Sequence, residues 1–410
     1  MLRIILFITL AVICLSGCKT TEVNRIMQPD LSTVPILNEL MVFNVNEHLK
    51  KTISTELGSP MVRHLKFSET GDFLLALTST SLLPSKNGIP RLVRQIWVIS
   101  TNPVKIDHFF PLHDIMGEKR DYFIAGLLTD NTFYFSGKNE FTDEHELHIY
   151  QIDPFQEIAR YQGIRATEFT NDDLIVGSPT INWRTGETHE GIRCITKMSG
   201  IGAFTSTGWI LCTEFYKSIA MQHPVSEEFK VWRPRMTPMR VITSASEKYM
   251  IAQGTYHQCR VWQMPGKKEV GRCLRNPWKR EPHYGISIAS HPQKDRFAVS
   301  WGDIIHAYDI EPFRQIIELE LERNIYSMGF AGDDILVVMT DRNIQVWDIT
   351  RQELIAVTPE SSMLTVSSPN VGELYSSADL VSPDGRWIVV YRANRHSERE
   401  FVLYEIPHRK

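Results

Sequence analysis

Few residues of this chain are arranged in a pattern that catalytic sites use. It has no Gly-x-Ser-x-Gly turn for a nucleophilic serine, no His-Glu-x-x-His pair for zinc and no glycine-rich phosphate loop. His108, His113 and Asp114 are close in sequence and could contribute to a metal site, but spacing alone does not establish one, and we interpret them as structural. The paired acids Asp172-Asp173 and Asp333-Asp334 fall in tight turns, which aspartate favours. We therefore predict no catalytic residue, no metal and no cofactor.

Two loops have a composition that suits protein recognition. Residues 275–284 combine Trp, Tyr and Arg, the residue types that dominate interface hot spots. A second, charged loop lies at residues 392–399. The candidate partner-binding residues are Trp278, Lys279, Arg280, His283, Tyr284, Arg392 and Arg399. The alternative is that Trp278 and Tyr284 pack against a neighbouring part of the fold and that the second loop is simply solvated.

Two cysteines are placed to form a disulfide. Cys259 and Cys273 flank residues 265–267, and a hairpin turn at Gly266 would set them directly opposite each other. Closing a loop of this size contributes about 3 kcal/mol to stability. The alternative is a pair of buried, reduced thiols. Cys194 with Cys212 is a weaker candidate pair, and an even number of cysteines is consistent with an exported protein.

The first seventeen residues are typical of an export signal. Met1-Leu2-Arg3 is a short positive start, and residues 4–15 form an apolar run too short to span a bilayer as a helix. The run ends in Leu15-Ser16-Gly17-Cys18, which resembles the lipobox of bacterial lipoproteins. This resemblance implies cleavage before Cys18 and acyl chains that anchor Cys18 to a membrane. By analogy with Gram-negative lipoproteins, Lys19 favours the outer membrane, with the protein facing the periplasm. The alternative is a plain secretory signal with an incidental cysteine.

A repeat of short strands must position these residues. Eight times, an apolar residue, a small polar turn and a β-rich run follow one another, as in residues 381–390. A strand usually centred on Trp or Tyr comes next, and most copies continue into a fourth strand, as in residues 353–357. The first and last copies begin at Phe67 and Val381, 314 residues and seven steps apart, so that one repeat spans about 45 residues. This is the length of a four-stranded propeller blade.

Two segments resemble known propeller repeats. Ile344-Gln345-Val346-Trp347-Asp348-Ile349 resembles the third strand of WD-repeat propellers, and Ser382-Pro383-Asp384-Gly385-Arg386 is similar to the repeat of Tol-system periplasmic proteins and prolyl oligopeptidases. The resemblance implies an all-β fold, a β-propeller of four-stranded antiparallel blades over residues 41–410. We count eight blades, or seven if residues 181–184 are irregular. The chain stops after a third strand, so we expect residues 40–45 to supply the missing strand and close the ring.

The predicted blades place the long loops on one face. Successive strands run antiparallel, so the second-to-third loops and the blade-to-blade connections emerge together. The long insertions of this set are residues 79–94, 107–121, 137–146, 275–284, 358–377 and 393–399. Binding residues gather on loops that a rigid scaffold holds, so this face is the expected binding surface.

The composition limits the partners of such a domain. The 410 residues are 42% hydrophobic and 22% charged, with a net charge of −4, which indicates a soluble domain and no nucleic-acid partner. We predict a signal peptide at residues 1–17, a polar tether at 18–40 and the propeller at 41–410. Its predicted role is a non-catalytic scaffold for an envelope protein. The alternative is a propeller enzyme or a binder of sugar or another small ligand at the central funnel, which converging carboxylates or histidines there would favour.

Overall fold

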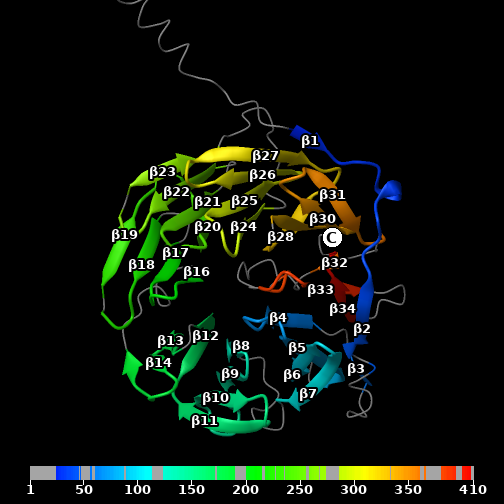
Figure 1. The fold of residues 1–410 in the computed structure, drawn as a ribbon. Coiled ribbons are helices and arrows are strands. Elements are labelled where there is room, and N and C mark those ends of the chain that lie inside the picture. Colours follow the sequence, from blue (N-terminus) through cyan, green and yellow to red (C-terminus); the bar gives the residue numbers. More distant parts are fainter. Residues whose placement is uncertain are drawn as a thin grey trace, which may run out of the picture.

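The computed structural model describes most of the chain after residue 24. The described residues are 25–45, 47, 56–57, 61–86, 89–112, 123–170, 173–189, 200–214, 218–226, 228–234, 236–254, 258–266, 268–273, 286–332, 334–360, 364–365, 380–393 and 399–407. Almost all of their elements are β-strands, together with a 3-10 turn at Leu31–Thr33. These strands form eight blades around one axis, with the first strand of each blade innermost (Figure 1).

The first half of the chain builds four blades. Blade 1 contains β4 (Met61–Phe67), β5 (Phe73–Lys86), β6 (Ile89–Thr101) and β7 (Val104–Pro111). Blade 2 contains β8 (Phe123–Thr129), β9 (Thr132–Lys138), β10 (His145–Gln151) and β11 (Gln156–Gln162). Blade 3 contains β12 (Arg165–Thr170), β13 (Leu174–Ser178), β14 (Thr180–Asn182) and β15 (Thr188–His189). Blade 4 contains β16 (Gly200–Phe204), β17 (Ile210–Glu214), β18 (Ser218–Gln222) and β19 (Phe229–Trp232).

The second half builds the other four. Blade 5 contains β20 (Pro238–Thr243), β21 (Tyr249–Gly254), β22 (Gln258–Gln263) and β23 (Glu269–Arg272). Blade 6 contains β24 (Ile286–Ser290), β25 (Arg296–Trp301), β26 (Ile304–Asp309) and β27 (Arg314–Glu320). Blade 7 contains β28 (Ile325–Ala331), β29 (Ile335–Thr340), β30 (Ile344–Asp348) and β31 (Glu353–Val357). Blade 8 contains β32 (Leu364–Thr365), β33 (Trp387–Ala393), β34 (Arg399–Glu405) and β2 (Glu39–Asn44).

This architecture confirms the predicted eight-bladed propeller. The seven-blade alternative required residues 181–184 to be irregular, but β14 pairs with both β13 and β15. The WD-like segment at residues 344–349 contains β30, the third strand of blade 7, as the resemblance implied. Central strands such as β21 and β29 are buried along their whole length. Each lies between two neighbouring blades, which explains their nearly continuous apolar sequences.

The polar turns between the first and second strands have a shared local cause. In blade 1 the Ser68 N–H donates to the Phe73 carbonyl at 2.8 Å, and the Ser68 hydroxyl accepts from the Phe73 N–H at 3.0 Å. Ser382 and Trp387 make the same two bonds in blade 8, each at 2.9 Å. A small hydroxyl residue therefore satisfies the hydrogen-bonding groups of the backbone where the chain reverses. This explains why the small polar turn recurs in the sequence.

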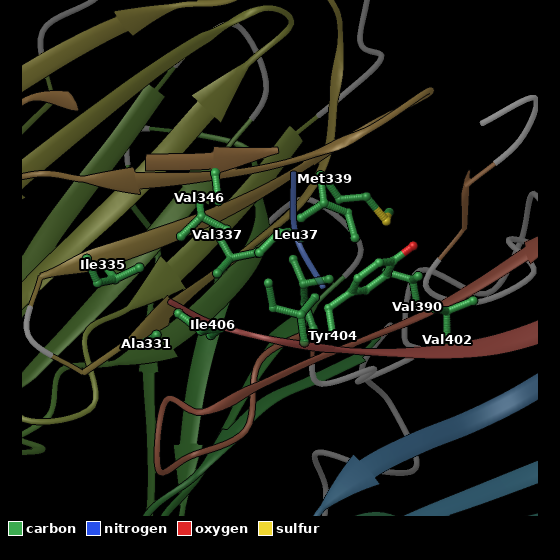
Figure 2. Packing of buried hydrophobic residues seen from close by; sticks show 14 residues of the cluster. Leu37, Ala331, Ile335, Val337, Met339, Val346, Val390, Val402, Tyr404 and Ile406 are labelled. Carbon is green, nitrogen blue, oxygen red and sulfur yellow. The ribbon is translucent and has the colours of Figure 1, made fainter. Parts of the chain in front are cut away.

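The expected closing strand is present. β2 pairs antiparallel with β34, so a strand from the beginning of the chain completes the last blade (Figure 1). Just before it, Leu37 is buried with Val390 and Tyr404 of blade 8 and Met339 of blade 7 (Figure 2). The ring is thus fastened by hydrogen bonds and by a hydrophobic core that joins blades 7 and 8.

The predicted boundary between tether and propeller needs correction. β1 (Arg25–Met27) pairs in parallel with β27 of blade 6, and Ile36 forms a bridge with Val357 of blade 7. Together with β2, residues 25–44 form a strap that crosses the outer edges of blades 6, 7 and 8 in turn. Covering exposed strand edges prevents unwanted pairing with other chains. The polar composition of residues 18–40 suggested a free tether, but from Arg25 onward the backbone is part of the fold.

Candidate binding face and central axis

One face of the ring, called here the turn face, carries the turns between first and second strands and between third and fourth strands. Hydrogen bonds link the turns of adjacent blades: Thr70 N–H to Asp130 at 3.1 Å, Ser206 N–H to Glu247 at 2.7 Å and Ser246 N–H to Asp295 at 3.0 Å. A further link joins Arg386 of blade 8 to Asp72 of blade 1 at 3.4 Å. Asp72, Asp130, Glu247 and Asp295 thus link adjacent blades.

Asp334 is the most connected of these acids. Its carboxylate accepts hydrogen bonds from Lys294 Nζ at 2.6 Å and from the Thr350 hydroxyl at 3.1 Å, and it also pairs with Arg296. Burial on its own would raise the pKa of Asp334, but the hydrogen bond from Lys294 and the charge of Arg296 outweigh it and lower that pKa. The expected turn residue is therefore also an ionic link between blades 6 and 7, which the sequence did not reveal.

The opposite face, called here the loop face, carries a projecting hairpin. β4 accompanies β5 only as far as Ser79, and β7 accompanies β6 only from Gln95 onward. Beyond these points β5 and β6 continue to pair with each other as far as Lys86 and Ile89. β3 (Glu56–Leu57) adds a further strand along β5. Residues 79–94, which we predicted to be a loop, are thus mostly a β-hairpin arm, and we use that name for residues 80–94.

Of the predicted partner-binding residues, only Arg392 and Arg399 fall within the described part of the chain. Trp278, Lys279, Arg280, His283 and Tyr284 fall in residues 274–285, outside the described residues, between the outer strand of blade 5 and the inner strand of blade 6. The predicted disulfide holds the start of this connection: Cys259 and Cys273 are bonded, with Cα atoms 5.1 Å apart. Arg392 and Arg399 lie on the paired strands β33 and β34, close to the end of their hairpin. Cys194 is outside the described residues.

The other residues considered for chemistry do not assemble into a site within the described part of the chain. The His108 ring stacks on Phe155, with centroids 4.3 Å apart, and Asp173 pairs with Arg184 at 2.9 Å. His113, Asp114, Asp172 and Asp333 are outside the described residues, as is Cys18. No group of three potential metal ligands occurs among the described residues. Nor does any helix in that part have the length and apolar character needed to cross a membrane.

A buried ionic cluster in blade 2 was missed by sequence reasoning. His148 is fully buried, and its two ring nitrogens lie 3.0 Å from Glu146 and 3.0 Å from Glu157. Burial opposes ionisation of Glu146, but hydrogen bonds from Asn139 and His148 lower its pKa. Because carboxylates hold both imidazole nitrogens, His148 has no free nitrogen to exchange a proton with a substrate. We interpret this cluster as structural.

Three inner strands carry a β-bulge at the same level of the ring. The extra residue is Arg63 in β4, Met239 in β20 and Tyr326 in β28. In each of these three blades, the residue that follows the extra one pairs with the fifth residue of the blade's second strand. Bulges change the direction of side chains. Tyr326 is 54% exposed although it lies on an innermost strand. The bulge in β20 is followed by Arg240, whose guanidinium is closely surrounded by protein, and burial lowers the pKa of this group.

The comparisons with known proteins show similarity in fold only. No protein-family model matches the chain, and no curated protein matches it in sequence. A structure of Kluyveromyces lactis Hsv2 with its complete loop 6CD has a TM-score of 0.51 and 13% identity over 73% of this chain and 99% of that chain. KlHsv2 with that loop replaced by a Gly-Ser linker gives the same values. The WD40 repeats of RRP9 match with a TM-score of 0.48 and 11% identity over 86% of this chain and 100% of that chain, too distant to carry an argument.

Proposed function

We propose that this protein is a lipid-anchored propeller of the bacterial cell envelope that acts as a non-catalytic scaffold for another envelope protein. The observation that carries this proposal is the difference between its two faces. The turn face consists of short turns, and several of their acidic groups bond to neighbouring blades. The loop face carries the hairpin arm. We infer that the connection containing Trp278 and Arg280 emerges on the same face, because it joins the outer strand of blade 5 to the inner strand of blade 6. Loops on a rigid scaffold are where binding residues gather.

The strap constrains how the anchored protein meets the membrane. Only residues 19–24 separate Cys18 from Arg25, which is paired to the outer edge of blade 6. An extended chain spans at most about 3.6 Å per residue, so an acylated Cys18 holds this edge within about 25 Å of the bilayer. We therefore propose that the propeller stands on the rim of blade 6. Both faces then remain accessible in the periplasm.

The anchor has a direct test. Cys18→Ser removes the acylated side chain, and we expect the protein to move from the membrane fraction to the soluble fraction on cell fractionation. Lys19→Ala, a change at the neighbouring residue, should leave the protein in the membrane fraction. Membrane retention of the Cys18→Ser variant would contradict the lipid anchor and favour a plain secretory signal.

The scaffold role is tested by site-specific photo-crosslinking in cells. A photo-reactive residue at Ser81 of the hairpin arm should crosslink to a defined envelope protein, whereas the same residue at the exposed Glu69 of the turn face should not. Trp278→Ala and Arg280→Ala are expected to weaken the Ser81 crosslink. No crosslink at Ser81, or equal crosslinks from both faces, would contradict a loop-face scaffold. A Ser81 crosslink that both variants leave unchanged would keep the scaffold and exclude those two side chains.

A further inference from the structure

Arg240 is a charged group that has no ion-pair partner among the described residues. It lies on the innermost strand of blade 5, directly after the bulge. Its side chain keeps some contact with solvent, yet burial is the one influence that acts on its pKa, and no group of the described chain forms an ion pair with it. A guanidinium carries five N–H donors and stays protonated. Removing such a charge from water without compensation is unfavourable, so a buried arginine is normally paired.

An unsatisfied acceptor lies on the strand beside it. Gln253 of β21 is directly opposite Arg240 in the register and is fully buried. Its Nε2 donates to the Ser300 carbonyl at 3.0 Å and to the Ser287 carbonyl at 3.3 Å, and these two bonds fix the orientation of the amide. The Gln253 Oε1 atom is buried and has no hydrogen-bond partner within the described part of the chain. Unsatisfied buried polar atoms are uncommon in folded proteins, and each calls for an explanation such as a bound water, ion or ligand.

The inner strands as a whole favour a negative ligand. Their sequences contain four basic residues, Arg63, Lys66, Arg165 and Arg240, and a single acidic residue, Glu168. The whole chain, by contrast, has a net charge of −4. An excess of basic over acidic residues in the sequences of these strands favours an anion over a cation as ligand. The exposed phenol of Tyr326 lies on the bulge of β28, at the same level as Arg240.

We propose that the axis of the propeller holds a binding site for a small oxyanion, a molecule that bears a phosphate or carboxylate group, with Arg240 as its charge partner. The oxyanion accepts hydrogen bonds from the guanidinium in the charge-assisted geometry that arginine provides. An O–H or N–H of the same ligand donates to Gln253 Oε1. Partly protonated phosphate carries both kinds of group. This site is independent of the scaffold role proposed above.

The test is isothermal titration calorimetry on the full-length protein in detergent, with inorganic phosphate and succinate as probes at constant ionic strength. We expect saturable binding of at least one probe by the wild type. Arg240→Met should weaken it at least tenfold, and Arg240→Lys should weaken it less, because lysine keeps the charge but loses the planar donor pair. Arg233→Met is the matched control: it removes the same charge at an exposed position just after the outer strand of blade 4, and should leave binding unchanged.

The outcomes separate the possibilities. Binding of phosphate alone assigns a phosphate-bearing ligand, and binding of succinate alone assigns a carboxylate. Wild-type affinity in Arg240→Met, or an equal loss in Arg233→Met, would overturn the site at Arg240. No binding of either probe by the wild type would also overturn it. If Arg240→Met fails to fold, the affinities of Arg240→Lys and Arg233→Lys are compared instead.

Discussion

Leu37 offers the sharpest test of the strap, because its neighbour Ile36 is a natural control. Leu37 packs with residues of blades 7 and 8 (Figure 2). It is 3% exposed, while Ile36 is 68% exposed. Changing Leu37 to Ala removes three buried carbon atoms, worth about 0.8 kcal/mol each in transfer free energy. The cavity left between the two blades adds to this loss. We expect the free energy of unfolding to fall by about 3 kcal/mol, and by less than about 0.5 kcal/mol in Ile36→Ala.

The assay is urea unfolding of the full-length protein in detergent, followed by the fluorescence of its buried tryptophans. Hydrogen exchange adds a local readout, since the Leu37 N–H donates to the Val357 carbonyl at 2.8 Å and should be protected. Leu37→Ala should also accelerate exchange across residues 25–44. If the two variants have equal unfolding midpoints and the Leu37 amide exchanges freely, residues 25–37 are a free tether and the strap is wrong.

Three further predictions concern the links between and within blades. Replacing both Cys259 and Cys273 by Ser should lower the free energy of unfolding by about 3 kcal/mol, measured by thermal unfolding, because the bond closes a loop over a separation of 14 residues. The pKa of Asp334 is lower in the folded state than in the unfolded state. Ionised Asp334 therefore adds to the free energy of unfolding above the unfolded pKa of about 3.9, and this contribution is lost as pH falls through the folded pKa. Asp334→Asn should therefore flatten the decline of stability below about pH 4, seen in urea midpoints across that range. Gly385→Ala should destabilise the protein, because φ is +73° and the new Cβ would lie 2.6 Å from the Gly332 nitrogen.

Each of these predictions has its own control. Cys212 is also disulfide-bonded, so reducing agent should lower the melting temperature of the wild type by more than that of the double serine variant. Equal sensitivity of the two proteins would contradict a stabilising bond between Cys259 and Cys273. If the fall of the urea midpoint at low pH is the same in Asp334→Asn as in the wild type, other carboxylates cause that fall. For the glycine, Gly332→Ala is the comparison, since a Cβ there meets nothing within 4 Å. Equal losses of unfolding free energy in Gly385→Ala and Gly332→Ala would contradict a steric clash at position 385.

Local patterns were enough to predict the blades. Each blade is built from short strands and tight turns. The signals for these, a short apolar run rich in β-formers and a small polar turn before it, lie within a few residues of each other. The register of Cys259 and Cys273 followed from one hairpin turn, and β2 followed from a blade that lacked a strand. The hairpin arm was misjudged because Pro84 and Gly88 lie in its sequence and are typical of loops.

Non-local relations were beyond such patterns. The strap pairs residues almost 300 positions apart, such as Arg25 with Glu318. A three-residue strand such as β1 is too short to show a periodic pattern in the sequence. Asp334 reads as an ordinary turn residue until the fold brings Lys294 and Arg296 of the preceding blade against it. The sequence thus determined the repeat, the fold class and the closing strand, because these depend on contacts between neighbours in the chain. Only the tertiary structure decided that Arg240, on an innermost strand, is desolvated and has no counter-charge among the described residues, because both depend on what other blades place around one side chain.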